Sequence, residues 1–411
     1  MFGLAVLRQT GRSELPPETR LAVTAPLGFR QVRPEVVDPH RSGPDSSRDA
    51  AGAGGVRRPD RPRQPVNGVI GQGHGLVLGG EGLDRDRGPE GLIVHAGHRT
   101  VGAIDHGGQI EPSVVQAHAL ALDVGGTKLA AARVSETGVL GEVKKTPTPE
   151  TGVWDACATL LRSVAGEDSV TAVGIASAGP VDTVAGTTAP INIADWHSGF
   201  GIVAAAQDLF PDARIHFAMD GACATWAEYL FGAARGVPNV LGMVVSTGIG
   251  GGIVLDGRMI SGRTGNPGHV GHIVVPGSTE ECSCGGIGCV ETVASGPSSV
   301  RWAKLQGWEG DDGEQLAKSA DAGDPIAVAA LQRAGTALGQ AIASAGALLD
   351  MDLVVVGGGF AQAGPMLWDP LHASLARHAR LNFLGDLRVV EAELGGLGTL
   401  TGAGALTLDR R

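Results

Sequence analysis

The types and spacing of four residues near the middle of the chain suit them to bind a metal ion: His272, Cys282, Cys284 and Cys289. They supply one imidazole and three thiolates within 18 positions, which is the ligand set that tetrahedral Zn²⁺ takes in a closed structural site. Three of the five cysteines fall within eight residues, and an odd, clustered set is a poor basis for a disulfide framework. The sequence therefore predicts a structural zinc site, with free or redox-active thiols as the alternative.

A first glycine-rich segment has the composition of a loop that holds phosphate. An apolar run leads into it, and a second strand-like run leads away, which predicts a β-hairpin. Glycines let backbone N–H groups approach a phosphate, a threonine adds a hydroxyl, and an aspartate can hold Mg²⁺ directly or through water. An ordinary tight turn is the alternative. The residues concerned are Asp123, Gly125, Gly126, Thr127 and Lys128.

A second segment, residues 244–257, repeats the design of the first. A strand-like run leads to Thr247 and Gly248, and a second run follows a cluster of glycines. Two hairpins of this kind favour a nucleotide site between two related lobes that face each other across a cleft. We expect these residues to contact the phosphates together with the first segment.

A third glycine cluster separates an apolar strand at 353–356 from a helix that begins near Pro365. A glycine turn between a strand and a helix lets a base or ribose approach the backbone closely. Gly358 and Gly359 are therefore candidate nucleotide contacts. A turn required only for packing the helix on the sheet is the alternative.

Asp220 follows a short apolar strand and precedes a helical segment. An aspartate at this position is commonly the N-cap of the helix. A carboxylate at the mouth of an α/β cleft can also accept the proton of an attacking hydroxyl during phosphoryl transfer. The two roles can coexist, and the residue is a candidate general base.

Other residues near these segments have less specific patterns. His269 and His272 are three positions apart and would share one side of a helical turn. Glu291 is a candidate either for a carboxylate at a helix start or for a hydrogen-bond acceptor of a polyhydroxylated ligand. Cys157 and Cys223 lie in apolar surroundings and are predicted to be buried core residues.

Composition excludes several classes of protein. The formal net charge of −11 argues against nucleic acid or an anionic membrane as the main partner. No apolar stretch reaches the roughly 20 residues that a bilayer span needs, and the first 30 residues lack the apolar core of a signal peptide. We therefore expect a cytoplasmic enzyme.

The chain changes character near residue 118. Residues 1–117 hold 14 arginines, no lysine and 11 of the 23 prolines, without helical or strand periodicity. They predict a disordered extension or a start placed too far upstream, and they contain no helix-turn-helix pattern. From there on, apolar runs that end in glycines alternate with helical patterns, which is typical of an α/β architecture. We expect one lobe at 118–237, a second at 238–399, and a C-terminal helix at 400–411 that can return to the first.

The motifs DVGGTK, GIASAGPVD, VSTGIGGGIVLDG, PGHVGH and CSCGGIGCVETVASG together resemble the ROK family of bacterial sugar kinases and repressors. The resemblance covers essentially all of residues 118–411. It implies an actin-like, hexokinase-like pair of α/β lobes, with ATP and Mg²⁺ in the cleft and a structural zinc. It also implies a homodimer or homotetramer.

The resemblance assigns roles to individual residues. Asp220 matches the general base that removes the proton from the attacking sugar hydroxyl, and the two hairpins match the phosphate motifs. Several positions match residues that contact the sugar, and one of them, His272, is also a zinc ligand. These positions are Gly179, Asn192, His269, His272 and Glu291.

Two positions bear on which sugar is bound. Many ROK glucokinases have glutamate where this chain has His269, whereas bacterial N-acetylmannosamine kinases resemble the His-x-Gly-His form more closely. Met219 stands where ROK members usually have an asparagine whose amide contacts the sugar, so one polar contact is lost. We expect phosphorylation of N-acetylmannosamine at the 6-hydroxyl, a step in sialic acid breakdown. A glucokinase or other hexose kinase, a polyphosphate donor and a sugar-responsive repressor are the alternatives.

Overall fold

The computed structural model describes residues 103–104, 110–111 and 118–408. The first two ranges form the strands β1 (Ala103–Ile104) and β2 (Ile110–Glu111), which pair antiparallel. The other predictions for residues 1–117 lie outside the described residues. Among the helices that are described, none combines the length and the apolar character needed to cross a membrane.

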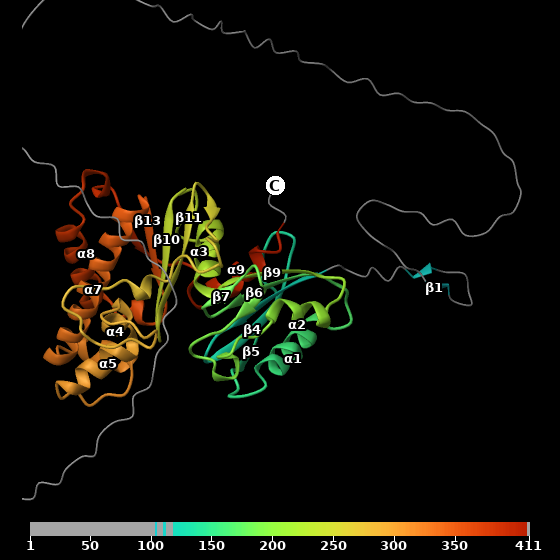
Figure 1. The fold of residues 1–411 in the computed structure, drawn as a ribbon, viewed down its shortest axis with the longest axis horizontal. Coiled ribbons are helices and arrows are strands. Elements are labelled where there is room, and N and C mark those ends of the chain that lie inside the picture. The colour runs from blue at the N-terminus through green and yellow to red at the C-terminus, as the bar shows by residue number, and fades with distance from the viewer. Residues whose placement is uncertain (1–102, 105–109, 112–117, 409–411) are drawn as a thin grey trace, which may run out of the picture. The chain divides into compact units, whose positions relative to one another are not determined.

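The first sheet has five strands in the order β5-β4-β3-β6-β9 (Figure 1). Its face with large side chains, among them Leu120, Leu122 and Val124, is covered by α1 (Val153–Ala165) and α2 (Ile202–Leu209). The glycine turn between β3 and β4 joins an antiparallel pair, while β6 and β9 run parallel to β3. The strands are β3 (His118–Val124), β4 (Lys128–Val134), β5 (Lys144–Pro147), β6 (Val170–Ser177) and β9 (Arg214–Met219).

The opposite face of the first sheet carries small residues and receives α9 (Gly398–Ala405). Glycines let the backbone of α9 come into direct contact with the backbones of its neighbours. A Cβ atom on Gly174 would collide with the carbonyl group of Ala403, and one on Gly402 would collide with the carbonyl group of Cys223. Helix α9 therefore packs tightly on the first sheet at Gly174 and on α3 (Asp220–Phe231) at Gly402.

The second sheet repeats the strand order and directions of the first, as β12-β11-β10-β13-β14. Both glycine segments predicted as phosphate-type turns are confirmed as β-hairpins. The strands are β10 (Val240–Val245), β11 (Ile249–Leu255), β12 (Arg258–Met259), β13 (Leu353–Gly357) and β14 (Arg388–Glu391). Outside both sheets, β7 (Val181–Asp182) and β8 (Thr187–Thr188) form a separate short pair.

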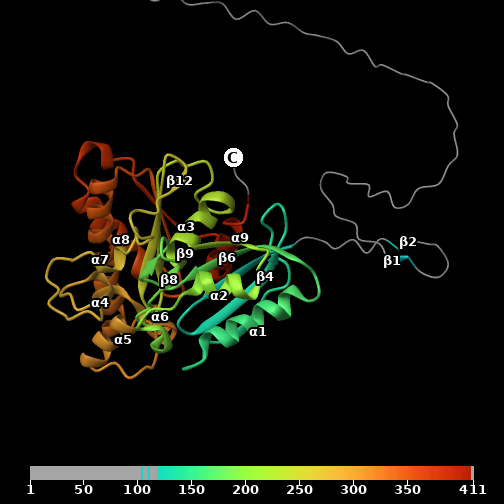
Figure 2. The same ribbon diagram turned by 45° about the vertical axis from the view of Figure 1, so that its right-hand side comes forward.

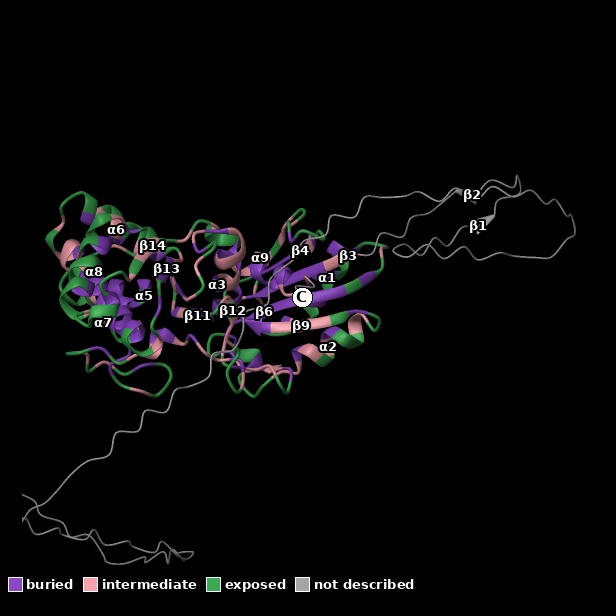
Figure 3. Cartoon of the chain, turned by 90° about the horizontal axis from the view of Figure 1, so that it is seen from above, coloured by how far each residue is buried: buried purple, intermediate pink, exposed green. Residues whose placement is uncertain are grey.

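A layer of helices packs against one face of the second sheet (Figure 3). The core of this layer includes Leu331, Leu338 and Leu371. The helices are α4 (Val290–Ala294), α5 (Gly296–Leu305), α6 (Gly313–Asp321), α7 (Pro325–Leu349) and α8 (Pro365–His378). Single 3₁₀ turns complete the chain: η1 (Ala194–Trp196), η2 (Val270–His272), η3 (Phe360–Gln362), η4 (Asn382–Leu384) and η5 (Gly395–Leu397).

Helix α3 (Asp220–Phe231) lies between the two sheets (Figures 1 and 2). Glycines bring it into backbone contact with the second sheet: a Cβ atom on Gly221 would collide with Gly251, and one on Gly252 with Ala222. Its remaining surface meets α9 and the apolar cluster that includes Val240 and Val355. The predicted α/β class is confirmed, with mixed sheets.

Candidate active site and metal cluster

The first hairpin places Asp123 at the carboxyl end of β3, where the residue is 9% exposed. Its turn is closed by a hydrogen bond from the N–H of Gly125 to the carbonyl of Lys128 (3.1 Å) and fixed by Thr148, whose hydroxyl donates to the Gly125 carbonyl (2.6 Å). Asp123 and Lys128 line a cavity of about 400 Å³. The turns that follow β10 and β13 in the second sheet form part of the other wall of this cavity, with Ser246, Gly358 and Gly359.

The second hairpin is closed by the N–H of Ser246, which donates to the carbonyl of Gly248 (2.9 Å). Thr247 lines a second, larger cavity of about 970 Å³, which Ser246 and Gly359 share with the first cavity. The starts of α5 and α6 and the side chain of Phe360 complete its wall. Residues predicted from three separate motifs therefore line two adjoining cavities.

Gly358 has a positive φ of 98°, and a Cβ atom there would collide with the backbone of Val245. This turn therefore requires glycine for the close approach of the end of β13 to β10, which is a packing role toward a strand rather than the packing of the helix on the sheet given above as an alternative. Gly359 lies on the walls of both cavities, so the turn is also in position for a ligand. Helix α8 begins at Pro365 as predicted, after the 3₁₀ turn η3 that the sequence did not indicate.

Asp220 is the first residue of α3, and the N-cap is Met219. The N-cap interpretation of Asp220 is therefore wrong by one position, because the chain is still extended at Met219. One carboxylate oxygen of Asp220 accepts a hydrogen bond from the N–H of the next residue, Gly221 (2.6 Å). Burial raises the pKa of Asp220 to about 6, and the Gly221 N–H opposes that shift.

Asp123 and Asp220 interact electrostatically. The pKa of Asp123 is raised to about 7, mainly by burial and also by the charge of Asp220, while the charge of Lys128 opposes the shift. Asp123 is buried and Asp220 is partly buried. Two interacting carboxylates with little access to water are costly unless a cation or a proton is shared between them. Such a pair can hold a divalent cation and accept a proton.

The structure brings together Gly179, Met219 and His269. A Cβ atom on Gly179 would lie 3.0 Å from Nε2 of His269 and 3.1 Å from the sulfur of Met219, so this contact needs glycine. Met219 is 2% exposed and packs with Val181 and Ala222. Burial, and to a lesser extent the nearby His272, lowers the pKa of His269.

Two other predicted sugar contacts lie against the phosphate-type hairpins. Asn192 is exposed and packs its side-chain amide on Gly126 in the first hairpin. Glu291 stands in the first turn of α4 and accepts a hydrogen bond from the N–H of Ile249 (2.7 Å). Its carboxylate also lies against Gly248, so it supports the second hairpin directly.

One polar residue at this site was missed. Asn266 bonds through its side chain to Val181, Thr264 and His269. The sequence offered no clear indication, because an asparagine beside proline and glycine reads as an ordinary turn residue.

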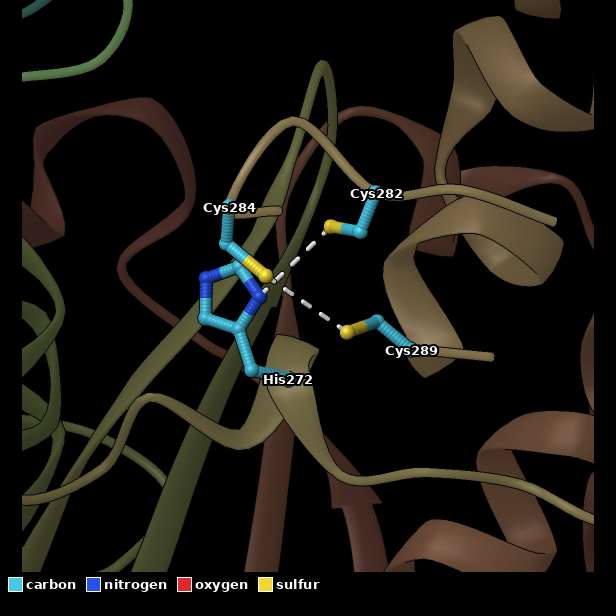
Figure 4. Close-up of side chains that lie close together, drawn as sticks. All are labelled: His272, Cys282, Cys284 and Cys289. Atoms are coloured by element: carbon cyan, nitrogen blue, oxygen red, sulfur yellow. Dashed lines mark hydrogen bonds between the residues drawn. The ribbon is translucent and has the colours of Figure 1, made fainter. Parts of the chain in front are cut away.

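The four predicted metal ligands meet at one point (Figure 4). Their ligand atoms all lie within 4.8 Å of one another, and the close pairs are Cys284 Sγ to Cys289 Sγ (3.8 Å) and His272 Nδ1 to Cys282 Sγ (3.7 Å). A zinc tetrahedron, with Zn–S of about 2.3 Å and Zn–N of about 2.0 Å, separates neighbouring ligands by roughly 3.5 to 3.8 Å. The four side chains therefore fit a zinc ion through Nδ1 and three sulfurs.

The other two cysteines, Cys157 and Cys223, are fully buried in apolar clusters, which confirms their predicted core role. The loop of the metal cluster is attached to the helical layer through Glu280, which pairs with Arg333 (2.5 Å) and Arg301 (3.0 Å). The cluster is therefore a fixed part of the second half of the fold.

Residues 119–410 match the sequence model of the ROK family. The chain belongs to the ROK family. A glucokinase of Streptomyces coelicolor is 30% identical to this ROK protein over 317 residues, covering 71% of this chain and 97% of the relative. An N-acetylmannosamine kinase of Citrobacter koseri is 36% identical over 245 residues, covering 58% and 82% respectively.

Solved structures show the same ROK fold. A ROK glucokinase of Streptomyces griseus, in complex with glucose and AMPPNP, superposes with a TM-score of 0.62 at 32% identity, covering 71% of this chain and 99% of that one. A ROK transcriptional regulator, a homologue of the E. coli MLC protein, superposes with a TM-score of 0.64 at 25% identity, covering 72% and 79%. The predicted family and enzyme class, a ROK sugar kinase, are confirmed, while relatives of this ROK protein differ in their sugars.

Proposed function

We propose that this ROK protein transfers the γ-phosphate of ATP to the 6-hydroxyl of a hexose, and that Asp220 is the general base. The proposal depends above all on the pair Asp123 and Asp220. The two carboxylates interact at the cleft, one beside the first phosphate-type hairpin and one at the start of α3. A base and a cation ligand are the groups that phosphoryl transfer to an alcohol requires.

Mg²⁺, held by Asp123 and the nucleotide, would neutralise charge on the phosphates. The hairpin N–H groups and the hydroxyls of Thr127 and Thr247 are proposed to position those phosphates, with Gly358 and Gly359 beside the nucleoside. Asp220, with a pKa of about 6, is mainly ionised at neutral pH and is still basic enough to take the proton of the 6-hydroxyl. The positive end of the α3 dipole lies beside it and favours the ionised form.

We further propose that the cluster of His272, Cys282, Cys284 and Cys289 binds a structural zinc ion. The fit of its ligand atoms to a tetrahedron supports this assignment. The ion would fix the orientation of the His272 ring and hold α4 and its Glu291 against the second hairpin. Gly179, Asn192, His269, His272 and Glu291 are proposed as the wall of the sugar pocket.

The preferred sugar is proposed to be N-acetyl-D-mannosamine. The histidine at position 269 and the 36% identity to a relative named N-acetylmannosamine kinase support it. Glucose is the competing substrate, favoured by relatives named glucokinase that align over nearly their whole length. We also propose a division into two lobes, residues 118–237 and 238–399, with α9 belonging to the first lobe. The presence of one five-stranded sheet in each range and the packing of α9 on the first sheet support this division.

A coupled kinase assay tests this proposal with glucose, mannose, N-acetylglucosamine and N-acetylmannosamine, each with ATP and with polyphosphate. We expect the highest kcat/KM for N-acetylmannosamine with ATP. A higher kcat/KM for glucose would replace it with the glucokinase assignment. A protein that phosphorylates no sugar but shifts upstream DNA in a mobility assay would favour a regulator, the class to which one structural neighbour belongs.

A further inference from the structure

The side-chain amide of Asn266 has a fixed orientation. Its oxygen accepts a hydrogen bond from the N–H of Val181 (2.9 Å), and its nitrogen donates to the carbonyl of the same residue (2.6 Å) and to the hydroxyl of Thr264 (2.9 Å). A backbone N–H can only donate and a carbonyl can only accept, so the oxygen and nitrogen of this amide cannot be exchanged.

This orientation determines the protonation of the neighbouring imidazole. Nε2 of His269 lies 3.2 Å from the amide oxygen of Asn266, which carries no hydrogen. Nε2 must therefore carry the hydrogen and donate it. In the neutral ring the other nitrogen, Nδ1, is then a hydrogen-bond acceptor. Within the described residues, Nδ1 of His269 makes no hydrogen bond, and it is not one of the side-chain atoms that are both fully buried and unpaired. Nδ1 is therefore accessible from outside the protein and free to accept a hydrogen bond.

The same amide fixes where the ring stands. Asn266 binds both backbone groups of Val181, and the N–H of Thr183 adds a bond to the carbonyl of Thr264 (3.0 Å). The 264–269 loop is thereby attached to the strand that follows Gly179. His269 rests on Gly179 beside Met219, the residue that precedes the proposed base.

We propose that Asn266 is a positioning residue that holds His269 in the Nε2–H tautomer, so that Nδ1 accepts a hydrogen bond from the bound sugar. This inference rests on the proposed sugar-kinase function and adds a restriction to it. The sugar must present a donor at that point, either a hydroxyl or the N–H of an N-acetyl group. A methyl ether at the same position cannot donate, and it is expected to bind poorly.

Nitrogen NMR of the full chain, labelled with ¹⁵N-histidine and free of substrate, reads the tautomer directly. His269→Gln identifies the signals of this ring by their loss. We expect a protonated Nε2 and an unprotonated Nδ1 in the wild type, and a mixture of tautomers in Asn266→Ala. A wild-type ring protonated on Nδ1 alone would overturn the proposal, whether or not the protein phosphorylates any sugar.

Kinetics test the consequence for the substrate. Asn266→Ala should raise the KM for the sugar about fivefold and leave the KM for ATP within about twofold, because one oriented hydrogen bond is lost. Asn239→Ala is the matched control, since Asn239 also joins two segments through its amide, between Asp256 and Asp352. Unchanged sugar KM in a folded Asn266→Ala protein contradicts the proposal. If the wild type phosphorylates no sugar, the proposed function fails, and the NMR result still decides the tautomer.

Discussion

At the scale of single residues, the proposed chemistry depends on two carboxylates with different proposed roles. Asp123 lies at the end of a strand beside the hairpin turn, and Asp220 lies at the start of a helix. Both have raised pKa values because burial removes water from the charged form. Each therefore responds strongly to a cation, a proton or a substitution nearby.

Replacing Asp220 by asparagine should lower kcat at saturating sugar by at least about 100-fold, because the amide cannot accept the proton of the hydroxyl. The KM for ATP should change little. A coupled assay of purified protein measures both constants, and Asp208→Asn, a change on the exposed surface of α2, serves as the control. Retention of more than a few per cent of the wild-type rate would remove Asp220 from the role of base.

The pH dependence follows from the same pair. Activity requires ionised carboxylates, so kcat/KM should fall as pH decreases through about 7 and about 6. Stability should respond in the opposite direction. Both pKa values are raised on folding, so the folded state binds protons more tightly than the unfolded chain. The contribution of these groups to the free energy of unfolding therefore increases as pH falls from about 7 toward about 4.

A kinetic pH profile and chemical unfolding over the same range check both directions, and the two apparent pKa values belong to the pair rather than to either residue. Asp123→Asn should flatten the part of the stability profile that these residues contribute. A kcat/KM that stays constant from about pH 5 to about pH 8, a range that includes both pKa values, would contradict the assignment.

At the scale of elements, α3 depends on a buried carboxylate for its attachment to the segment between β14 and α9. Glu228 is 5% exposed and accepts hydrogen bonds from the backbone N–H groups of Ala233 (2.9 Å), Glu393 (3.2 Å) and Leu394 (2.8 Å). The last two residues lie between β14 and α9. One side chain therefore joins the helix between the sheets to the segment that leads from the second sheet back to the first.

Glu228→Gln should lower the free energy of unfolding by about 2 to 3 kcal/mol, because an amide NH₂ would face backbone donors and leave one of them unpaired. Denaturant unfolding measures the change. Glu142→Gln, at an exposed position, is the control and should be close to neutral. Equal losses in the two variants would contradict the anchoring role of Glu228.

Elements with a local pattern could be predicted, and those set by packing could not. The two hairpins followed from glycines between apolar runs, and β13 and α8 from the turn at Gly358. The buried residues of α3 do not follow one apolar face, because Ala227 is buried whereas the apolar residues Ala224, Tyr229 and Phe231 are only partly buried. The reason is that α3 packs on both sides, so its buried residues surround the helix and no single face stands out.

The candidate site shows the same division. The proposed metal ligands and Asp220 were visible because their residue types are unusual where they stand, and the four side chains from a stretch of 18 residues do converge. Asn266 was not visible, because its partners Val181 and His269 are brought to it only by tertiary folding. The sugar remains a prediction for a related reason, since Met219 shows which contact is absent without showing what replaces it.

At the scale of the whole molecule, the cluster of His272, Cys282, Cys284 and Cys289 is proposed to connect the wall of the sugar pocket with the second hairpin. Purified protein should contain about one zinc ion per chain by elemental analysis. Cys284→Ser should lose most of the metal and unfold at a lower denaturant concentration, and its KM for ATP should rise because α4 and Glu291 support the hairpin. Cys157→Ala removes a thiol elsewhere and should keep its zinc. Zinc content that is equal in the Cys284 variant and the wild type would exclude this site.

The glycines between α3 and β11 have a consequence for the accuracy of the site. Where Gly221 meets Gly251 and Gly252 meets Ala222, there is no side chain that could change rotamer and alter the spacing. Asp220 begins the same helix, and the second hairpin begins the same strand. The spacing between the proposed base and the proposed phosphate turn is therefore set mainly by contacts between main chains, with Thr225 as the side chain that also packs against Gly252.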